Sequence, residues 1–484
     1  MTDPEPAPDE TAGGEPSQTT DDLRRVIGFW SGVAILIGCT IGSGIFRTPA
    51  SIAAKLDQPL LILGLWTGLG IITLCGALTL AELACLIPKT GGIYAYLRAA
   101  YGDATAFVFG WLWLLISTPA SLGAMSTFFA EQLLVRFRPD GANPVLFRWG
   151  SWSGGELTEV QAVAMAVTVV LSLFNVFGVR LGTAIQNIFT SIKVGALLAI
   201  IAAAFLLGSG DPGRWVHGTG RVMALSPVAG LAAAMASVVW TYDGWIGASL
   251  VAGEIKDPQR KLSGIMIVGT LALVVLYVGA NLAYLYLIPL NLLQEDKAKV
   301  ATRVMDMTVG PAGGTIVGYC IMASVFGALN GSILSNARVT YAQARDGLAF
   351  AFLGRCHPRW KTPHVAILIQ GAAGVVLIQF LKDFDSLTTY FVVVAWGSLI
   401  FAMAAIFVLR RKMPDAPRPY RTPFYPWVPL VFIAGTTIGL SAIVWNDALS
   451  LDPPNYSPLV GIGIALAGFP VYWLWRQFRA DRET

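Results

Sequence analysis

Charged residues are scarce in this chain of 484 residues, because only 13% are Asp, Glu, Lys or Arg while 55% are hydrophobic. Soluble domains carry about 25% charged residues, so the composition excludes an ordinary soluble enzyme or binding module. The polar segments are at most roughly 30 residues long, which is shorter than the smallest independent domains. The function must therefore lie within the apolar segments.

Histidine and catalytic motifs are also scarce. The chain has 3 histidines, His217, His357 and His364, and all of them lie in or beside polar segments. It contains no HExxH or CxxC motif and no phosphate-binding P-loop sequence. These absences argue against an enzyme that uses metal chemistry and against a pump driven by ATP. We expect neither enzymatic activity nor a cofactor, and we expect no nucleic-acid partner.

The 5 cysteines give no sign of a disulfide framework. Four of them lie inside apolar segments, where a free cysteine behaves as a small hydrophobic residue. The fifth, Cys356, lies in a polar segment. The four in apolar segments are Cys39, Cys75, Cys85 and Cys320.

Long apolar runs dominate what is present. A helix needs roughly 20 apolar residues to cross the hydrocarbon core of a bilayer, and such runs recur along nearly the whole chain. They predict an all-α, polytopic membrane protein with twelve transmembrane helices. The expected spans are 26–53, 60–87, 104–134, 158–178, 181–207, 226–253, 262–288, 312–336, 363–381, 386–409, 426–446 and 457–475.

The polar segments predict the orientation in the membrane. With the N-terminus inside, Lys and Arg are about twice as frequent in the cytoplasmic segments as in the external ones, as the positive-inside rule requires. Both termini are therefore expected in the cytoplasm. Residues 1–25 are acidic and rich in proline, which predicts a disordered tail. Residues 477–484 form the expected cytoplasmic tail at the other end.

Two spans contain helix-breaking residues at their centres. Gly42-Ser43-Gly44 interrupts the first span, and Thr241 to Gly244 interrupts the sixth. Glycines within a span often serve helix packing, but matched interruptions five helices apart indicate an inverted repeat of five plus five helices. We expect helices 1–5 at 26–207, helices 6–10 at 226–411, and two further helices at 426–476.

A broken helix exposes amide groups where its second half begins and carbonyl groups where its first half ends. The amides of Ser43, Gly44 and Ile45 can bind a carboxylate, because glycine leaves the backbone accessible. The carbonyls of Thr40, Ile41 and Trp240 can accept hydrogen bonds from an ammonium group. The predicted ligand is a zwitterionic α-amino acid.

Several motifs carry a family resemblance over residues 26–476. Together they resemble the amino acid–polyamine–organocation superfamily and are most similar to its L-type amino acid transporter group. The motifs are IGSGIFRTP, WTYDGW, AELACLIPKTGGIYAYL, FGALNGSILSNARVTYAQARDG and RPYRTPFYPWVPLVF.

The resemblance implies five plus five inverted helices and transport of α-amino acids by alternating access. It implies that Trp240 acts as a gate at the break of helix 6. It also implies that Lys193, a lone charge inside span 5, occupies the place where related transporters hold sodium. The alternative for Lys193 is a shallow position from which its ammonium group reaches the membrane interface.

Three further polar positions leave alternatives open. Asp243 either pairs with a cationic substrate or serves as a helix cap or member of a local network. Asn330 either faces the substrate or forms a hydrogen bond between helices. Glu82 and Glu254, near the cytoplasmic ends of their spans, indicate a structural network more than a proton relay.

These observations predict a secondary active transporter of neutral α-amino acids in the cell (inner) membrane, working as a sodium-independent exchanger. The alternatives are a proton-coupled symporter of the same fold and an amino acid sensor that does not transport. The lipid bilayer and the amino acid substrate are the expected partners. In eukaryotic members of the group that this chain resembles, a cysteine between helices 3 and 4 joins a heavy subunit. The corresponding segment 136–157 contains no cysteine, so the resemblance implies no disulfide-linked heavy subunit.

Overall fold

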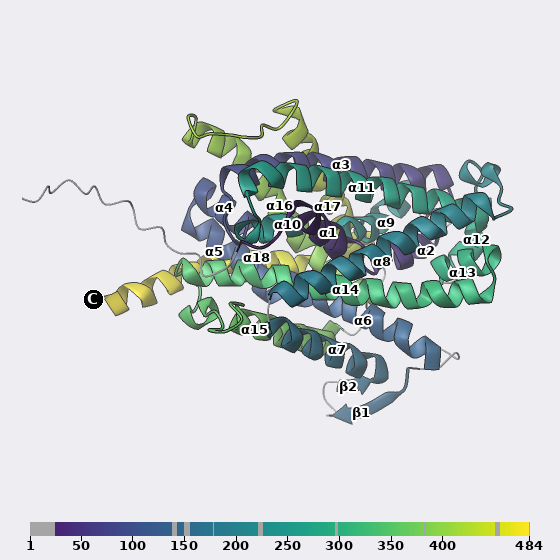
Figure 1. Ribbon diagram of the computed structural model, residues 1–484, viewed down its shortest axis with the longest axis horizontal. Helices are drawn as coiled ribbons and strands as arrows, with labels where there is room; N and C mark the ends of the chain where they lie inside the picture. The colour runs from purple at the N-terminus through teal and green to yellow at the C-terminus, as the bar shows by residue number, and fades with distance from the viewer. Residues whose placement is uncertain are drawn as a thin grey trace, which may run out of the picture.

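Nearly all of the described chain is helical, and its helices pack around one large apolar core (Figure 1). The tail predicted at 1–25 begins outside the described residues, so its disorder stays a prediction. The computed structural model describes residues 25–137, 143–149, 155–177, 179–220, 226–295, 299–381, 384–450 and 455–483.

The described residues of the first half of the chain form eight α-helices. The π-helical turn η1 (Trp113–Ser117) joins the fifth helix to the sixth. The helices are α1 (Phe29–Thr40), α2 (Gly44–Ala53), α3 (Pro59–Leu86), α4 (Ile93–Tyr101), α5 (Asp103–Leu112), α6 (Thr118–Phe137), α7 (Glu159–Val176) and α8 (Val179–Leu206).

The part of the second half that the structure describes forms ten more α-helices. Short helical turns lie between them at η2 (Pro212–Trp215), η3 (Ala252–Glu254), η4 (Ala351–Gly354) and η5 (Asn446–Ser450). The helices are α9 (Pro227–Tyr242), α10 (Gly247–Leu250), α11 (Pro258–Leu287), α12 (Leu290–Leu293), α13 (Val300–Thr308), α14 (Pro311–Arg345), α15 (His364–Leu381), α16 (Phe384–Lys412), α17 (Trp427–Trp445) and α18 (Ser457–Glu483).

The described residues contain 11 helical stretches that are long and apolar enough to cross a membrane. The helix α9 is apolar too, but with 16 residues it is shorter than these. The prediction of an all-α polytopic membrane protein is confirmed. The count of twelve spans stays a prediction, because it requires α9 with its continuation to form the sixth.

Three segments differ from the sequence-based expectation. A small antiparallel hairpin, β1 (Val145–Trp149) and β2 (Gly155–Thr158), lies where only a loop was expected. The helix α14 continues to Arg345, nine residues beyond the predicted end of its span at 336. The helix α18 continues to Glu483, so the predicted tail at 477–484 is helical over nearly all of its length.

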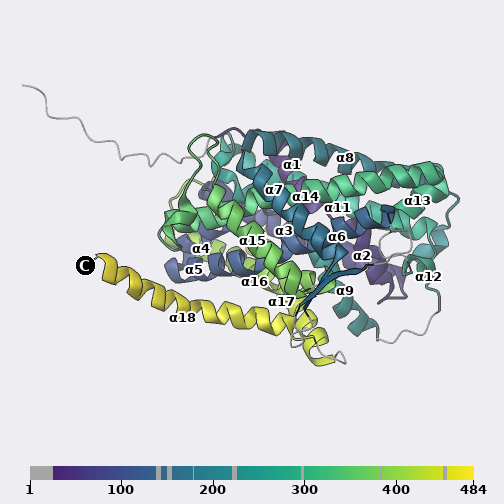
Figure 2. The same ribbon diagram turned by 90° about the horizontal axis from the view of Figure 1, so that it is seen from below.

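The molecule has two distinct ends along its long axis (Figures 1 and 2). One end, here called the hairpin end, carries α12 and α13, and β1 and β2 lie below the bundle on the same side. The opposite end, here called the C-terminal end, carries the end of α18, which runs along one edge of the bundle in Figure 2. The helices α3 and α11 run side by side along another edge.

Candidate functional site

Two helices are interrupted near the middle of the bundle, as the sequence predicts. The helix α1 ends at Thr40 and α2 begins at Gly44, while α9 ends at Tyr242 and α10 begins at Gly247. The positions differ slightly from the prediction, because Gly44 already belongs to α2, and Thr241 and Tyr242 belong to α9. The second break therefore comprises residues 243–246.

The two breaks pack directly against each other through one glycine from each. A methyl group added to Gly44 would lie 2.5 Å from the Thr241 Oγ1 atom and 2.8 Å from its Cα atom. Gly244 has φ +102°, and a methyl group there would lie 2.8 Å from the backbone of Cys39 and 2.9 Å from the Cα atom of Thr40. Each break therefore needs glycine where the other half-helix passes.

The start of α2 leaves backbone donors open. The first amides of a helix have no acceptor within it. Among the described residues, the amides of Ser43, Gly44 and Ile45 donate no hydrogen bond. Ser43 also provides no side-chain cap. These donors, together with the positive end of the helix dipole, favour an anionic group at this point.

Lys193 binds the end of α1, on the other side of the break from the start of α2. Its side chain is fully buried, and Nζ donates to the carbonyl oxygens of Gly38 at 2.8 Å and Ile41 at 2.7 Å. Ser324 on α14 also donates to the Ile41 oxygen, at 3.3 Å. The alternative of a shallow lysine reaching the membrane interface is wrong. The ammonium group instead joins α8 to the last turn of α1.

Two more polar side chains of α8 face α1 on the same side as Lys193. The Thr190 hydroxyl donates to the Ala34 oxygen at 3.0 Å. The Gln186 amide is buried between Gly38 on α1 and Gly331 on α14. A methyl group added to Gly38 would lie 1.9 Å from the amide nitrogen, and one added to Gly331 would lie 2.8 Å from the amide oxygen. Neither polar atom of Gln186 has a hydrogen-bond partner among the described residues.

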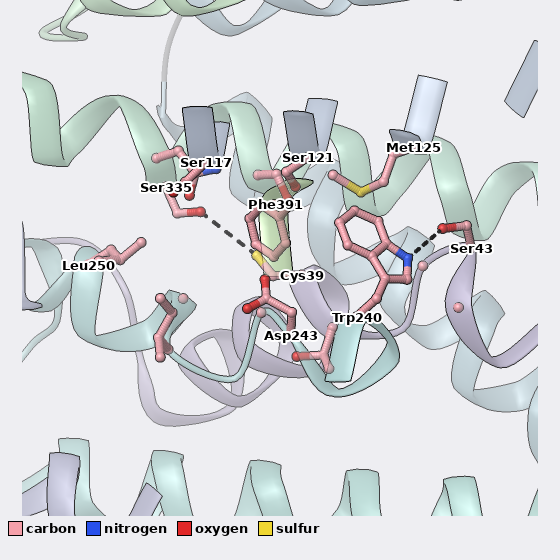
Figure 3. A pocket seen from close by; sticks show the side chains of 18 of the residues that line it. Cys39, Ser43, Ser117, Ser121, Met125, Trp240, Asp243, Leu250, Ser335 and Phe391 are labelled. Atoms are coloured by element: carbon pink, nitrogen blue, oxygen red, sulfur yellow. Dashed lines mark hydrogen bonds between the residues drawn. The ribbon is translucent and has the colours of Figure 1, made fainter. Parts of the chain in front are cut away.

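A pocket lies between the two breaks (Figure 3). Figure 3 shows Trp240 and Ser43 toward one end of it and Leu250 toward the other, with Asp243 between them. The remaining walls come from η1, α6, α14 and α16. The lining residues that lie outside the two broken helices are Trp113, Ser117, Ser121, Met125, Ser332, Ser335, Asn336 and Phe391.

The structure brings five of the predicted site residues together in this pocket. They are Thr40, Ser43, Gly44, Trp240 and Asp243. Three other predicted residues do not line it: Ile41, Ile45 and Asn330.

The carbonyl groups predicted to bind an ammonium group already accept hydrogen bonds from the protein. The Thr40 oxygen accepts from the Tyr277 hydroxyl at 3.0 Å, and the Trp240 oxygen accepts from the Asp243 amide at 3.1 Å. Ile41 accepts from Lys193 and Ser324, as described above. A carbonyl oxygen has two lone pairs, so Thr40 and Trp240 each keep one for a ligand, whereas Ile41 uses both.

Asp243 takes part in a local network. Its Oδ1 atom accepts from the indole nitrogen of Trp396 at 3.1 Å. It does not cap the second half-helix, because the N-cap position of α10 is Ile246 and no side chain caps it. Of the two structural roles expected, the network is therefore correct and the cap is wrong.

Asn330 forms a hydrogen bond between helices. Its Oδ1 atom accepts from Asn175 Nδ2 on α7 at 2.8 Å, and its side chain is buried outside the pocket. This is the second of the two roles that the sequence left open. In this conformation Asn330 does not contribute to the pocket wall.

Trp240 lies at the end of the pocket nearest Ser43 (Figure 3). Its indole nitrogen donates to the Ser43 hydroxyl at 3.4 Å, which joins the two broken helices. Its ring meets Phe391 at 5.2 Å and Phe384 at 5.8 Å between centroids, in both cases edge to face. Such contacts favour one orientation of the indole. The position is compatible with the predicted gate.

The polar wall opposite the breaks could not be predicted from the sequence. Ser117 ends the π-helical turn η1, and Ser121 follows one helical turn later on α6. Both line the pocket. A π-helical turn inserts one residue and so rotates the side chains that follow it. Since no residue pattern marks such a turn, hydrophobic periodicity does not identify this wall.

Two buried acidic residues form the structural network that the sequence predicts at the C-terminal end. Glu254 pairs with Arg338 at 2.7 Å, and both side chains are almost fully buried. Glu82 accepts two hydrogen bonds from Arg410 and lies 3.4 Å from Arg418. Because both carboxylates are held by arginines, they connect distant helices at this end.

The fold and the pocket together define a class of protein. A polytopic helical bundle with a polar pocket between two broken helices is the architecture of a membrane transport protein. Among the described residues, no three His, Cys, Asp or Glu side chains are placed to hold a metal ion. The site can bind a small charged ligand through backbone groups alone.

The comparisons with known proteins identify the family. The model of the amino acid permease family matches residues 27–467, and the chain belongs to this family. It lies within the amino acid–polyamine–organocation superfamily, as the motifs suggested.

Three relatives illustrate this membership. The serine/threonine exchanger SteT of Bacillus subtilis is 31% identical over 95% of this chain and 98% of its own length. The b(0,+)-type amino acid transporter 1 of Mus musculus is 27% identical over 97% of this chain and 92% of its own length. The human cystine/glutamate transporter is 29% identical, with 95% and 87% covered. The chain is thus an amino acid permease and not an enzyme.

Proposed function

We propose that this permease exchanges neutral α-amino acids across the cell membrane, without sodium, by alternating access. The observation that supports this most directly is the pair of open half-helix ends at one pocket. The amides of Ser43 and Gly44, which line the pocket, bind the α-carboxylate. The free lone pairs of Thr40 and Trp240 bind the α-amino group.

The wall opposite the breaks supports a neutral side chain. Ser117, Ser121 and Met125 are uncharged, and Phe391 limits the available length. Asp243 is the only charged side chain among the described residues that line the pocket, and Trp396 already donates to it. SteT, the relative named above, is a serine/threonine exchanger, which agrees with a pocket that contains several hydroxyl groups.

Recognition through the backbone groups of the substrate makes a direct prediction. N-acetylated amino acids and amino acid esters should compete with labelled substrate at least about 100-fold more weakly than free amino acids, because each lacks one of the charged groups. The measurement is inhibition of uptake into proteoliposomes. Equal competition by a free amino acid and its methyl ester would exclude the amides at α2 as the carboxylate site.

The same unpaired backbone amides and carbonyls support an exchange mechanism. An empty carrier must expose amides and carbonyls to water alone while it reorients, whereas bound substrate satisfies them. Uptake into vesicles loaded with unlabelled substrate should therefore exceed uptake into vesicles loaded with buffer by about tenfold, at equal pH on both sides. Replacing sodium with potassium should not change the rate, because the Lys193 ammonium group takes the structural place of the ion.

The same experiment distinguishes the alternatives. Equal uptake in both types of vesicle, with a large rise when the outside is acidified, would favour proton symport. Binding without any flux would favour a sensor. Steep dependence on a sodium gradient would contradict the role proposed for Lys193.

We further propose that both termini face the cytoplasm of a cell whose inner membrane holds the protein, so that the hairpin end is external. Helices 1–5 (26–207) and 6–10 (226–411) would then form the two inverted repeats. The purified chain should transport alone, because the external segment 136–157 lacks the cysteine needed for a disulfide-linked heavy subunit. Activity that appears only after addition of a second protein would contradict this.

A further inference from the structure

An ion pair lies between the pocket and the hairpin end. Arg47, on the first turn of α2, pairs with Glu131 on α6. The Arg47 side chain is 11% exposed and that of Glu131 is 30% exposed. Loss of one partner of such a sheltered pair leaves the other charge poorly solvated, which destabilises the arrangement that held them.

The same guanidinium group lies over aromatic rings. Its Cζ atom is 4.3 Å from the ring centroid of Phe384 and 5.8 Å from that of Phe128. Phe384 meets Trp240 edge to face, and Trp240 lines the pocket. Three layers therefore follow one another from the pocket toward the hairpin end: the Trp240 indole, the Phe384 ring and the Arg47 guanidinium group with its carboxylate partner.

These layers come from four helices. Arg47 and Trp240 lie on α2 and α9, which are the outer halves of the two broken helices. Glu131 lies on α6, and Phe384 begins α16. A helix that moves relative to the others must separate the ion pair, the cation–π contact or the aromatic contact. The cluster is thus connected to both elements that bind the substrate under the proposed function.

We infer that Arg47 is a positioning residue of the transport cycle. With Glu131 it holds Phe384 against Trp240 and so keeps the pocket closed toward the hairpin end. It does not line the pocket and acts through Phe384. This inference rests on the proposed function, because closure toward one side matters only for a carrier that opens alternately.

Cys39 offers a reporter already present in the chain. Its side chain lines the pocket near Ser335 (Figure 3). A charged methanethiosulfonate reagent that cannot cross the membrane, added on the side of the hairpin end, reaches this thiol only while the closure is open. The rate of modification therefore measures how often the pocket opens to that side.

The test compares Glu131→Gln and Arg47→Gln with the wild-type chain in proteoliposomes. Each variant should raise the rate of Cys39 modification from the hairpin side by about tenfold. Each should also lower both the maximal exchange rate and the KM on that side, because the carrier rests open there and closes less often. Arg47→Lys keeps the charge pair and should recover part of the wild-type behaviour.

Two controls make the result specific. Cys39→Ser should abolish the modification that Glu131→Gln accelerates, which identifies the thiol. Asp103→Asn breaks the more exposed ion pair with Arg98, which lies outside this cluster, and should leave the modification rate unchanged. The inference is overturned if both pair-breaking variants keep the wild-type modification rate and KM while exchange falls only with the amount of folded protein. A wild-type chain that fails to exchange would instead overturn the proposed function.

Discussion

Exchange by the Lys193→Ala variant is expected to fall by at least about 100-fold per folded molecule, because hydrogen bonds from a charged donor contribute roughly 1.5–3 kcal/mol each and two are lost. The Gly38 oxygen then loses the Lys193 donor, and the Ile41 oxygen keeps only the Ser324 hydroxyl. The amount of folded protein should fall less than exchange, since packing elsewhere along α8 is unchanged. The measurement is exchange in proteoliposomes, divided by the monodisperse protein recovered.

A matched control lies one turn away on the same helix. Thr190→Val also removes a side-chain donor from α8 to α1, but the donor is neutral and lies farther from the break. Its loss should lower exchange by less than about tenfold, since a neutral hydrogen bond contributes about 1 kcal/mol. If both variants lower exchange equally, the charge of Lys193 has no special role. If Lys193→Ala keeps half of the wild-type rate, the lysine does not support the break.

The second large effect is expected from Gly244→Ala, which should abolish exchange. The residue has φ +102°, and its new methyl group would lie 2.8 Å from backbone atoms of Cys39. Backbone atoms cannot rotate away as a side chain can, so the two breaks must separate and the binding groups with them. Exchange should fall by at least about 100-fold, corresponding to the roughly 3 kcal/mol of strain that such a conformation stores.

Two other glycines serve as controls for this change. Gly64→Ala lies on the exposed face of α3, where no atom lies within 4 Å of the added methyl group, and should be neutral. Gly247→Ala meets only the Cys39 side chain, at 3.3 Å, and should have a small effect. Wild-type exchange by Gly244→Ala would show that the contact between the breaks can relax without consequence.

The sequence predicts the breaks better than it predicts their limits. Glycine and aspartate at the centre of apolar spans indicate an interruption, and the structure has one in each place. Thr241 and Tyr242 were expected in the second break, but α9 accommodates both. The Thr241 hydroxyl donates to the Ser237 oxygen, and the Tyr242 hydroxyl donates to the Trp66 oxygen. Polar side chains satisfied in this way do not interrupt a helix.

The direction in which a side chain faces could not be predicted. Asn330 and Ser332 lie two residues apart on α14, yet only Ser332 lines the pocket. Arg338 lies beyond 336, where the expected span ends. Its pairing with Glu254 instead allows α14 to continue as a buried helix. Both outcomes depend on partners from distant parts of the chain, which helical periodicity does not encode.

The space between Gly38 and Gly331 that holds the Gln186 side chain has a consequence for the evolution of the family. Gly38 and Gly331 leave room for this amide, and a methyl group at Gly38 would overlap it at 1.9 Å. A relative with a larger residue at position 38 can keep the same helix spacing only with a shorter residue at position 186. Substitutions at these two positions are therefore expected to covary among permeases, and a chain that combines a long residue at both must separate α1 from α8.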